Sequence, residues 1–335
     1  MIEQISKLVK GQDLDEAEAS QAMETIMRGD ATPAQIAGFM IALRIKGETV
    51  DEVTGMARTA RAMAIPIAVS NPSQLLDTCG TGGDGSGSFN ISTLAAIVAA
   101  GAGARVAKHG NRAASSSCGS ADVLEALGVT IDLAPEAVAA CIEEAGIGFL
   151  FAPVFHPSFR FAGVPRRELG VRTVFNILGP LCNPAGARRQ ALGVPDAAIA
   201  PLMAEVLERL GVERAIVFSA EGLDELATSG PSLVIEIIDG SRRQYTLDPA
   251  ELGLTPAPPE ALRGGGPEEN AAIARAVLGG EKGARRDVVL LNSAAALRAA
   301  GLADGWKDGL GLAAESIDSG RAGQALERWA AASRA

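Results

Sequence analysis

Apolar residues recur at helical spacing through the first 65 or so positions. The segment "DLDEAEASQAMETIMRG" keeps this spacing and ends in a glycine, as many helices do. The next one begins at Thr32-Pro33, an N-cap followed by proline at the first helical position. Thr49 and Glu52 have the spacing of a capping box at the start of a third. We therefore predict a small all-helical N-terminal domain without a chemical motif.

The pattern changes at Pro66 and Pro72, which mark a linker. Beyond it, short apolar runs alternate with helix-like segments, which is typical of a mostly parallel sheet flanked by helices. The expected strands are residues 75–80, 104–110, 147–153, 213–222, 232–240 and 243–247, and the expected helices are 91–103, 119–128, 134–146, 198–211, 268–280 and the segment from 313. The predicted fold is thus α/β, with a helical domain over residues 1–70 and a larger domain over 71–335.

Polar clusters follow the predicted strands, at the edge where parallel sheets bind ligands. The first, "GTGGDGSG" over residues 80–87, has five glycines among eight residues and one carboxylate, Asp84. Glycines let backbone N–H groups approach a phosphate, and the following helix start, with Ser92 as its expected N-cap, favours an anion. The run lacks the lysine of a Walker A loop and the spacing of a dinucleotide fingerprint. It is either a structural turn or a phosphate site in which Asp84 binds a sugar hydroxyl or acts through a cation.

Two further clusters carry cations. Lys108 ends a predicted strand and is followed by Asn111, four serines within residues 115–120 and a helix start; this is either a polar surface loop or a diphosphate site. The segment 156–170 is interpreted as an arginine-containing loop. In it, either Arg166 or Arg167 is suited to hold a carboxylate.

An acidic pair, Asp224-Glu225, follows the predicted strand "AIVFS". Adjacent carboxylates on a loop are commonly just solvated. At a strand end opposite a phosphate loop they also suit Mg²⁺. Taken together, the clusters predict an Mg²⁺-assisted enzyme acting on a phosphorylated substrate and a second anionic group.

Composition narrows the class of partner. The 335 residues carry a net charge of −10, which argues against nucleic-acid and membrane partners. No signal peptide or membrane span is expected, and the four cysteines lack CxxC spacing, so we expect buried thiols in the cytoplasm and no zinc site.

The motifs in combination resemble one enzyme family. The blocks "GTGGD", "KHGNRAASSSCGSADVLEALG", "HPSFRFAGVPRRELGVRTVFNILGPLCNPAGA" and "GLDEL" are similar to those of the anthranilate phosphoribosyltransferases, and the similarity covers most of the chain. The resemblance implies transfer of phosphoribose from 5-phosphoribosyl 1-diphosphate to anthranilate in tryptophan biosynthesis. It also implies a homodimer through the helical domain, on which part of residues 165–190 packs.

The resemblance assigns roles to individual residues. The phosphoribosyl diphosphate site would comprise Gly80, Gly83, Asp84, Ser88, Asn90, Ser92, Thr93, Lys108, Asn111, Ser115, Ser116 and Ser120. The anthranilate site would comprise Gly80, Asn111, His156 and Arg166, and two Mg²⁺ ions per subunit would be held by Ser92, Asp224 and Glu225. Lys108, Asp84 and Asn111 would be the catalytic residues, whereas the proton acceptor stays open between His109, His156 and solvent.

Two other functions are compatible with these motifs. One is a pyrimidine nucleoside phosphorylase-type enzyme, which shares the fold and a glycine-rich phosphate loop but uses free phosphate. The other is a non-catalytic binding protein on the same fold. An assay of anthranilate consumption that depends on phosphoribosyl diphosphate and Mg²⁺ separates the three.

Overall fold

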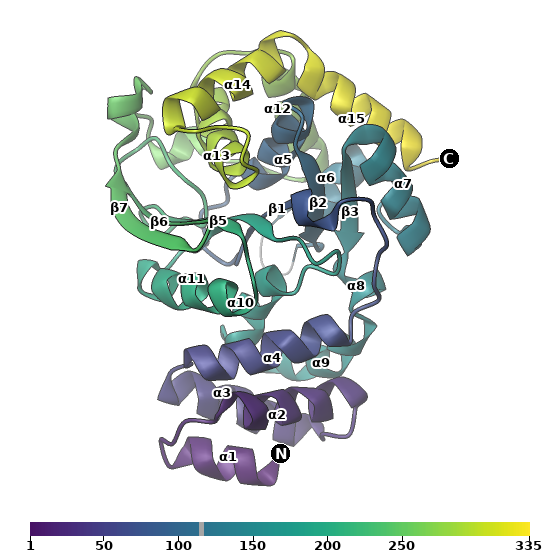
Figure 1. Cartoon of the computed structure of the whole chain (residues 1–335), viewed down its shortest axis with the longest axis vertical. Helices are drawn as coiled ribbons and strands as arrows, with labels where there is room; N and C mark the ends of the chain where they lie inside the picture. Colours follow the sequence, from purple (N-terminus) through teal and green to yellow (C-terminus); the bar gives the residue numbers. More distant parts are fainter. Residues whose placement is uncertain (114–116) are drawn as a thin grey trace.

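Four helices form a bundle at one end of the molecule (Figure 1). The computed structural model describes residues 1–113 and 117–335. The bundle comprises α1 (Ile2–Val9), α2 (Glu16–Arg28), α3 (Pro33–Lys46) and α4 (Val50–Ala62). Capping boxes begin α3 at Thr32 and α4 at Thr49, which confirms both predicted helix starts. Three of the four helices thus begin at a capping box, α2 at Asp15 among them, whereas α1 has no side-chain cap.

The larger part is built on a seven-stranded sheet within the described residues, in the order β3-β2-β1-β4-β5-β6-β7. Neighbouring strands from β3 to β5 are parallel, and β6 and β7 continue the sheet antiparallel as a hairpin. The strands are β1 (Leu75–Gly80), β2 (Arg105–Gly110), β3 (Ile147–Phe151), β4 (Arg189–Gly193), β5 (Arg214–Ser219), β6 (Ser232–Ile238) and β7 (Ser241–Leu247). The predicted mostly parallel sheet is confirmed.

Helices cover both faces of this sheet (Figure 1). The face away from the bundle carries mainly α5 (Ile91–Gly101), α6 (Ser120–Ala126), α12 (Pro267–Leu278), α13 (Ala284–Ala299), α14 (Trp306–Asp318) and α15 (Arg321–Ala332). Towards the bundle lie α8 (Ala152–Phe155), α9 (Arg160–Leu169), α10 (Val174–Leu181) and α11 (Ala200–Arg209), while α7 (Pro135–Ala145) packs beside β3.

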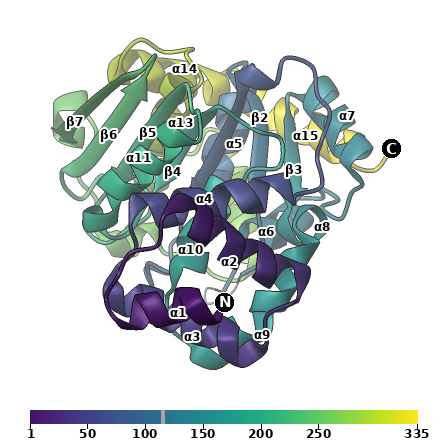
Figure 2. The same cartoon turned by 60° about the horizontal axis from the view of Figure 1, so that its bottom comes forward.

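The bundle and the sheet share one apolar core. Phe39 of α3, Phe175 of α10, Met203 of α11 and Ile235 of β6 belong to the same cluster of buried side chains. Figure 2 shows α9 beside α3 at the bundle end of the molecule. Helices α9 and α10 therefore pack on both the bundle and the larger part.

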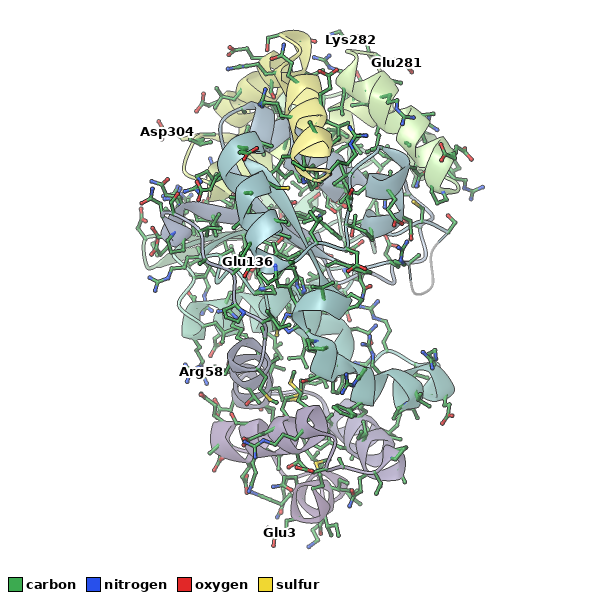
Figure 3. All side chains as sticks on the ribbon, turned by 90° about the vertical axis from the view of Figure 1, so that its right-hand side faces the viewer. Glu3, Arg58, Glu136, Glu281, Lys282 and Asp304 are labelled. Carbon is green, nitrogen blue, oxygen red and sulfur yellow. The ribbon has the colours of Figure 1, made fainter. Side chains whose placement is uncertain are left out.

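Charge is concentrated on the outside. The labelled side chains in Figure 3 are all exposed and extend from one end of the molecule to the other: Glu3, Arg58, Glu136, Glu281, Lys282 and Asp304. Among the residues of the two described ranges, none of the helices combines the length and apolar character needed to cross a membrane.

Two local predictions were wrong. The segment interpreted as an arginine-containing loop is largely helix α9, even though Pro165 lies inside it. Ala162 and Pro165 are buried, and Ala162 belongs to the core shared with the bundle, so packing outweighs the helix-breaking effect of proline. Ser92 is not an N-cap, because α5 begins one residue earlier, at Ile91.

Candidate active site

The glycine loop, residues 80–87, begins where β1 ends. Strand order reverses at β1, which lies between β2 and β4, and such a reversal opens a crevice at the carboxyl ends of the strands. The loop is tied to β4 by a hydrogen bond from the Thr81 N–H to the Gly193 carbonyl, at 3.0 Å. The glycine run therefore occupies the position where α/β proteins bind ligands.

Asp224 reaches this loop from beyond β5. Its Oδ2 accepts a hydrogen bond from the Gly82 N–H at 2.7 Å. A Cβ on Gly80 would lie 2.1 Å from the same oxygen, so only glycine permits this approach. The structure thus brings the first and last predicted clusters into direct contact.

Glu225 reaches the start of α5. Its Oε1 accepts a hydrogen bond from the Ser92 N–H at 2.9 Å. The carboxylate therefore takes one of the free N–H groups of this helix end, the role that we expected from the Ser92 side chain. Thr93, the next residue, is buried, and its Oγ1 has no hydrogen-bond partner in the described part of the chain.

Negative charge accumulates here. Burial, followed by the neighbouring Asp84 carboxylate, raises the pKa of Asp224 to about 6. Burial and then Asp224 raise the pKa of Glu225 well above its usual range. Asp84 Oδ1 accepts from the Ser86 N–H at 3.2 Å, whereas its buried Oδ2 has no partner within the described residues. The three carboxylates lack enough positive charge around them.

Lys108 supplies the nearest buried cation. Its side chain is 2% exposed, and its Nζ donates to the Thr78 carbonyl and, at 3.5 Å, to Ser92 Oγ. Burial lowers the pKa of Lys108, and the nearby Asp77 carboxylate opposes this effect most strongly. The ammonium thus lies under the glycine loop, near Glu225 and the start of α5.

Asn111 and Ser120 face each other behind β2. The Ser120 hydroxyl donates to the Asn111 carbonyl at 3.2 Å, and Asn111 Oδ1 accepts from the Arg112 N–H at 2.8 Å. Ser115 and Ser116 lie outside the described residues. Ser117 donates to the Gly265 carbonyl at 2.8 Å, so this loop contacts a segment from near the end of the chain.

That distant segment also holds the far end of the glycine loop. Asn270 Nδ2 donates to Asn90 Oδ1 at 3.0 Å, and Asn90 Nδ2 donates to the Cys118 carbonyl at 3.1 Å. Ser88 forms an isolated β-bridge with Arg263. Sequence reasoning did not single out Asn270, although it ends the glycine-rich "GGGPEEN" run.

His109, His156 and two phenylalanines form an apolar cluster beside β2. The imidazole centroids are 5.1 Å apart, Phe159 lies edge-on to His156, and Phe175 lies edge-on to Phe159. Arg166 lies over the Phe175 ring, 5.8 Å from its centroid. Burial lowers the pKa of Arg166, and the described residues offer it no carboxylate within ion-pair distance.

Both imidazoles are neutral and their tautomers are fixed. His109 Nδ1 bonds the Gly179 carbonyl at 3.1 Å, and His156 Nε2 bonds the Cys182 carbonyl at 2.8 Å. A carbonyl only accepts, so these nitrogens carry the protons. His109 Nε2 and His156 Nδ1 are then buried acceptors without a partner among the described residues. Burial lowers the pKa of His109 to about 3 and that of His156 to about 4.

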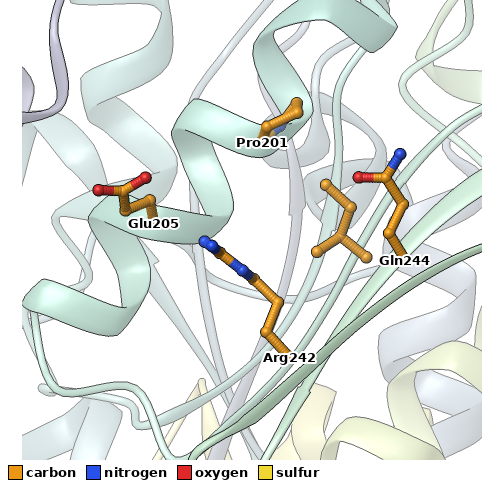
Figure 4. A pocket seen from close by; sticks show the side chains of 5 residues that line it. Pro201, Glu205, Arg242 and Gln244 are labelled. Carbon is orange, nitrogen blue, oxygen red and sulfur yellow. The ribbon is translucent and has the colours of Figure 1, made fainter.

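Two hollows have volumes near 200 Å³. One, of about 230 Å³, lies between the bundle and the glycine loop, where Arg44 and Glu48 face Gly83 and Asp84. The other, of about 200 Å³, lies between α11 and β7 and is lined by Pro201, Glu205, Ile235, Arg242 and Gln244 (Figure 4). The ionic side chains of the second hollow pair with residues of α11, so only the first belongs to the site.

Comparison with known proteins agrees with this arrangement. Residues 2–64 match the model of the glycosyl transferase family helical bundle domain, and residues 72–323 match that of its a/b domain. The chain is 60% identical over 321 residues to anthranilate phosphoribosyltransferase 2 of Streptomyces coelicolor, covering 96% of each chain.

Solved structures extend the likeness. The anthranilate phosphoribosyltransferase of Thermus thermophilus is 51% identical, with a TM-score of 0.94 and 99% of each chain covered. The enzyme of Saccharomyces cerevisiae in complex with PRPP and Mg is 28% identical, with a TM-score of 0.90, covering 99% of this chain and 97% of that one. The chain belongs to the anthranilate phosphoribosyltransferase family.

Arg172 is a site residue that sequence reasoning missed in this member of the family. Its guanidinium donates to the Gly82 carbonyl and, at 3.4 Å, to Thr81 Oγ1. The available signal was a lone arginine between Gly170, which ends α9, and Thr173, which begins α10.

Proposed function

We propose that this protein transfers the phosphoribosyl group of 5-phosphoribosyl 1-diphosphate to the amine of anthranilate and releases diphosphate, as a step of tryptophan biosynthesis. The observation that carries the proposal is the convergence of the glycine loop, Lys108 and the Asp224-Glu225 pair. The aromatic cluster adds Arg166, a partly buried cation that has no ion-pair partner within the described residues. The named relatives support the same reaction.

The phosphoribosyl diphosphate would bind at the carboxyl ends of β1 and β2. Backbone N–H groups of the glycine loop and Lys108 suit the diphosphate oxygens. Asp84 suits the ribose hydroxyls or a metal-bound water. The remaining residues proposed for this site are Gly80, Gly83, Ser88, Asn90, Ser92, Thr93, Asn111, Ser115, Ser116 and Ser120.

The oxygen atoms that the protein offers at this site meet only part of the coordination that Mg²⁺ requires. Carboxylates suit a hard cation, and the unpartnered buried oxygen of Asp84 beside Asp224 indicates missing positive charge. Within residues 1–113 and 117–335, however, no three His, Cys, Asp or Glu side chains are arranged to hold a metal by themselves. Mg²⁺ commonly uses one or two carboxylates plus substrate phosphates, which matches this set. We propose two ions per subunit, with Ser92, Asp224 and Glu225 as the protein ligands.

The reaction breaks the bond between ribose C1 and the diphosphate oxygen, which leaves with the electron pair. The amine nitrogen of anthranilate forms the new bond to C1 and then loses one proton. Lys108 stabilises the charge that develops on the leaving oxygens. Bound Mg²⁺ would add Lewis-acid stabilisation of the same charge.

Anthranilate requires positioning, because an aromatic amine is already uncharged near neutral pH. Arg166 is the group proposed to hold its carboxylate, since it is a desolvated cation without an ion-pair partner in the described ranges. Gly80, Asn111 and His156 are proposed to line the same path. The bare nitrogens of His109 and His156 can accept an N–H group of the substrate.

The direct test follows anthranilate fluorescence in the presence of phosphoribosyl diphosphate and Mg²⁺. We expect the signal to fall only when all components are present. A protein that leaves anthranilate untouched but cleaves a pyrimidine nucleoside with free phosphate would refute the proposal in favour of a phosphorylase. Binding of both ligands without turnover would refute the catalytic role.

We also propose a cytoplasmic homodimer that pairs through the helical domain, taken as residues 1–70 with part of 165–190. Ile2 and Val9 of α1 and Ile45 at the end of α3 are 74%, 72% and 81% exposed. Large apolar side chains exposed together favour a protein interface. Sedimentation of the Ile45→Glu variant against the native chain tests this interface. A reducing compartment suits the four cysteines, which are buried and form no disulfide within the described residues.

A further inference from the structure

The backbone of Gly82 is hydrogen-bonded from both sides. Its N–H donates to Asp224, which follows β5 of the sheet. Its carbonyl accepts from Arg172, which lies between α9 and α10. The two peptides on either side of the Gly82 Cα therefore connect the acidic pair to the helices next to the bundle.

Arg172 belongs to the bundle side of this connection. The following Thr173 donates its hydroxyl to Met40 Sδ of α3 at 3.6 Å. Ala162 of α9 and Phe175 of α10 are buried in the core shared with the bundle. Arg172 forms no ion pair with any carboxylate of the described residues, so its hydrogen bonds to the loop are its main polar contacts.

The Arg172 guanidinium packs closely against the backbone of the glycine loop. A Cβ on Gly83, which has φ +70°, would lie 2.0 Å from Arg172 Nη1. The hollow of about 230 Å³ lies next to this contact and is lined by Arg172, Gly83, Asp84 and Arg44. A change in the loop backbone must therefore move the guanidinium, and the hollow gives it room to move.

Arg166 is six residues before Arg172, on the same helix-turn unit. When phosphate oxygens take the loop N–H groups, the Gly82 peptide must give up or share its bond to Asp224. The Gly82 carbonyl belongs to the next peptide and is joined to that N–H through the Gly82 Cα. A shift of the loop at Gly82 therefore also shifts this carbonyl and the arginine that binds it.

We propose that Arg172 is a positioning residue that couples occupancy of the glycine loop to the aromatic-amine site around Arg166. The inference rests on the proposed function, because it takes a polyphosphate for the loop and an aromatic carboxylate for Arg166. It predicts that each ligand raises the affinity for the other, and that the gain depends on the two-donor guanidinium of Arg172.

The test measures binding in a complex that cannot react. Anthranilate is titrated by its fluorescence with and without saturating diphosphate and Mg²⁺, in the native chain and in the Arg172→Ala variant. In the native chain we expect diphosphate to raise the anthranilate affinity by about fivefold or more. In Arg172→Ala the ratio should fall to within about twofold of one.

The control is Arg160→Ala, which removes an exposed arginine from the start of the same helix and should keep the native ratio. Thermal unfolding checks that each variant folds. If Arg172→Ala does not fold, Arg172→Lys replaces it, and its ratio should fall by about twofold or more because one ammonium lacks the planar fork.

A folded Arg172 variant that keeps the native ratio overturns the inference, even when both separate affinities are weaker. A native chain that binds both ligands without mutual effect overturns it as well. A native chain that binds neither ligand overturns the proposed function too, which distinguishes the two failures.

Discussion

The two buried histidines should make the protein sensitive to mild acid. His109 and His156 are the only histidines of the chain, and both are neutral in the fold, with pKa values lowered by burial to about 3 and about 4. An unfolded histidine has a pKa near ~6.5. Between these values the unfolded chain binds more protons than the folded one. The stabilisation is therefore complete above about pH 6.5 and is lost as the pH falls towards about 4.

The size of the effect follows from these pKa values. For each histidine, linkage gives a loss of about 2 kcal/mol in the free energy of unfolding between pH 7 and pH 5. This figure depends little on the folded pKa, because both values lie well below 5. The pair should therefore contribute a loss of about 4 kcal/mol in the free energy of unfolding.

Other groups also titrate between pH 5 and pH 7. The pH dependence of stability must therefore be compared between the native chain and histidine variants. The raised pKa of Asp224 acts in the opposite sense: its burial destabilises the fold as the pH rises through about 6. Glu225 adds to this opposing effect. The difference between native chain and variant isolates the histidines.

The variants should preserve the backbone contacts. His109→Asn places an amide nitrogen where Nδ1–H bonds Gly179, and His156→Gln places one where Nε2–H bonds Cys182. Urea unfolding, monitored by circular dichroism, gives the free energy of unfolding at pH 7 and at pH 5. From pH 7 to pH 5 this free energy should fall by about 2 kcal/mol less in each variant than in the native chain.

The control is Glu136→Gln, which changes an exposed side chain. Between pH 7 and pH 5 its free energy of unfolding should fall by as much as that of the native chain. Equal losses in the native chain and in both histidine variants would refute the reasoning, since the imidazoles would then not be buried and neutral.

Three further changes test the site. Asp224→Asn combined with Glu225→Gln should lower kcat by roughly a hundredfold or more and weaken Mg²⁺ binding; near-native kcat would remove these residues as metal ligands. Arg166→Ala should raise the KM for anthranilate by about tenfold or more, with a smaller effect on phosphoribosyl diphosphate, and an unchanged KM would place the carboxylate contact elsewhere. Gly83→Ala should raise the KM for phosphoribosyl diphosphate by about tenfold. The new methyl group would both strain a backbone of positive φ and clash with the Arg172 guanidinium. Gly87→Ala shares the positive φ without a close contact, so an equal effect of both changes would show that strain alone matters.

Many elements of the fold could be predicted because their signals are local, whereas β4, α10 and α13 were not predicted. Thr32 and Thr49 cap their own helices, and the turn at Asp239-Gly240 joins the hairpin β6–β7. Helix α9 was missed because Pro165 indicates a break, whereas Ala162 is held in the core by residues far away in the sequence. Local patterns carry no information about such packing.

The contacts within the site could not be predicted for the same reason. Glu225 and Ser92 are 133 residues apart, and Asn270 and Asn90 are 180 apart, yet each pair is joined by a hydrogen bond. Spacing identified Glu225 as a candidate ligand but gave no sign that its carboxylate also accepts the Ser92 N–H at the start of α5. Strand order, which no residue pattern specifies, creates these contacts.

Asp84, the acidic residue of the glycine loop, is one of three carboxylates that lie close to one buried cation. The Asp84 carboxylate lies beside that of Asp224, and the neighbouring Glu225 adds a third negative charge. Lys108 is the buried cation whose positive charge partly offsets them. A bare diphosphate entering this site would meet three carboxylates and gain little from one ammonium. In the proposed function, a diphosphate that arrives with divalent cations would instead find oxygen ligands on one side and loop N–H groups on the other. The same carboxylates that disfavour free phosphate therefore favour a metal-bound polyphosphate, and this selection needs the Gly80 contact that brings Asp224 within reach of the loop.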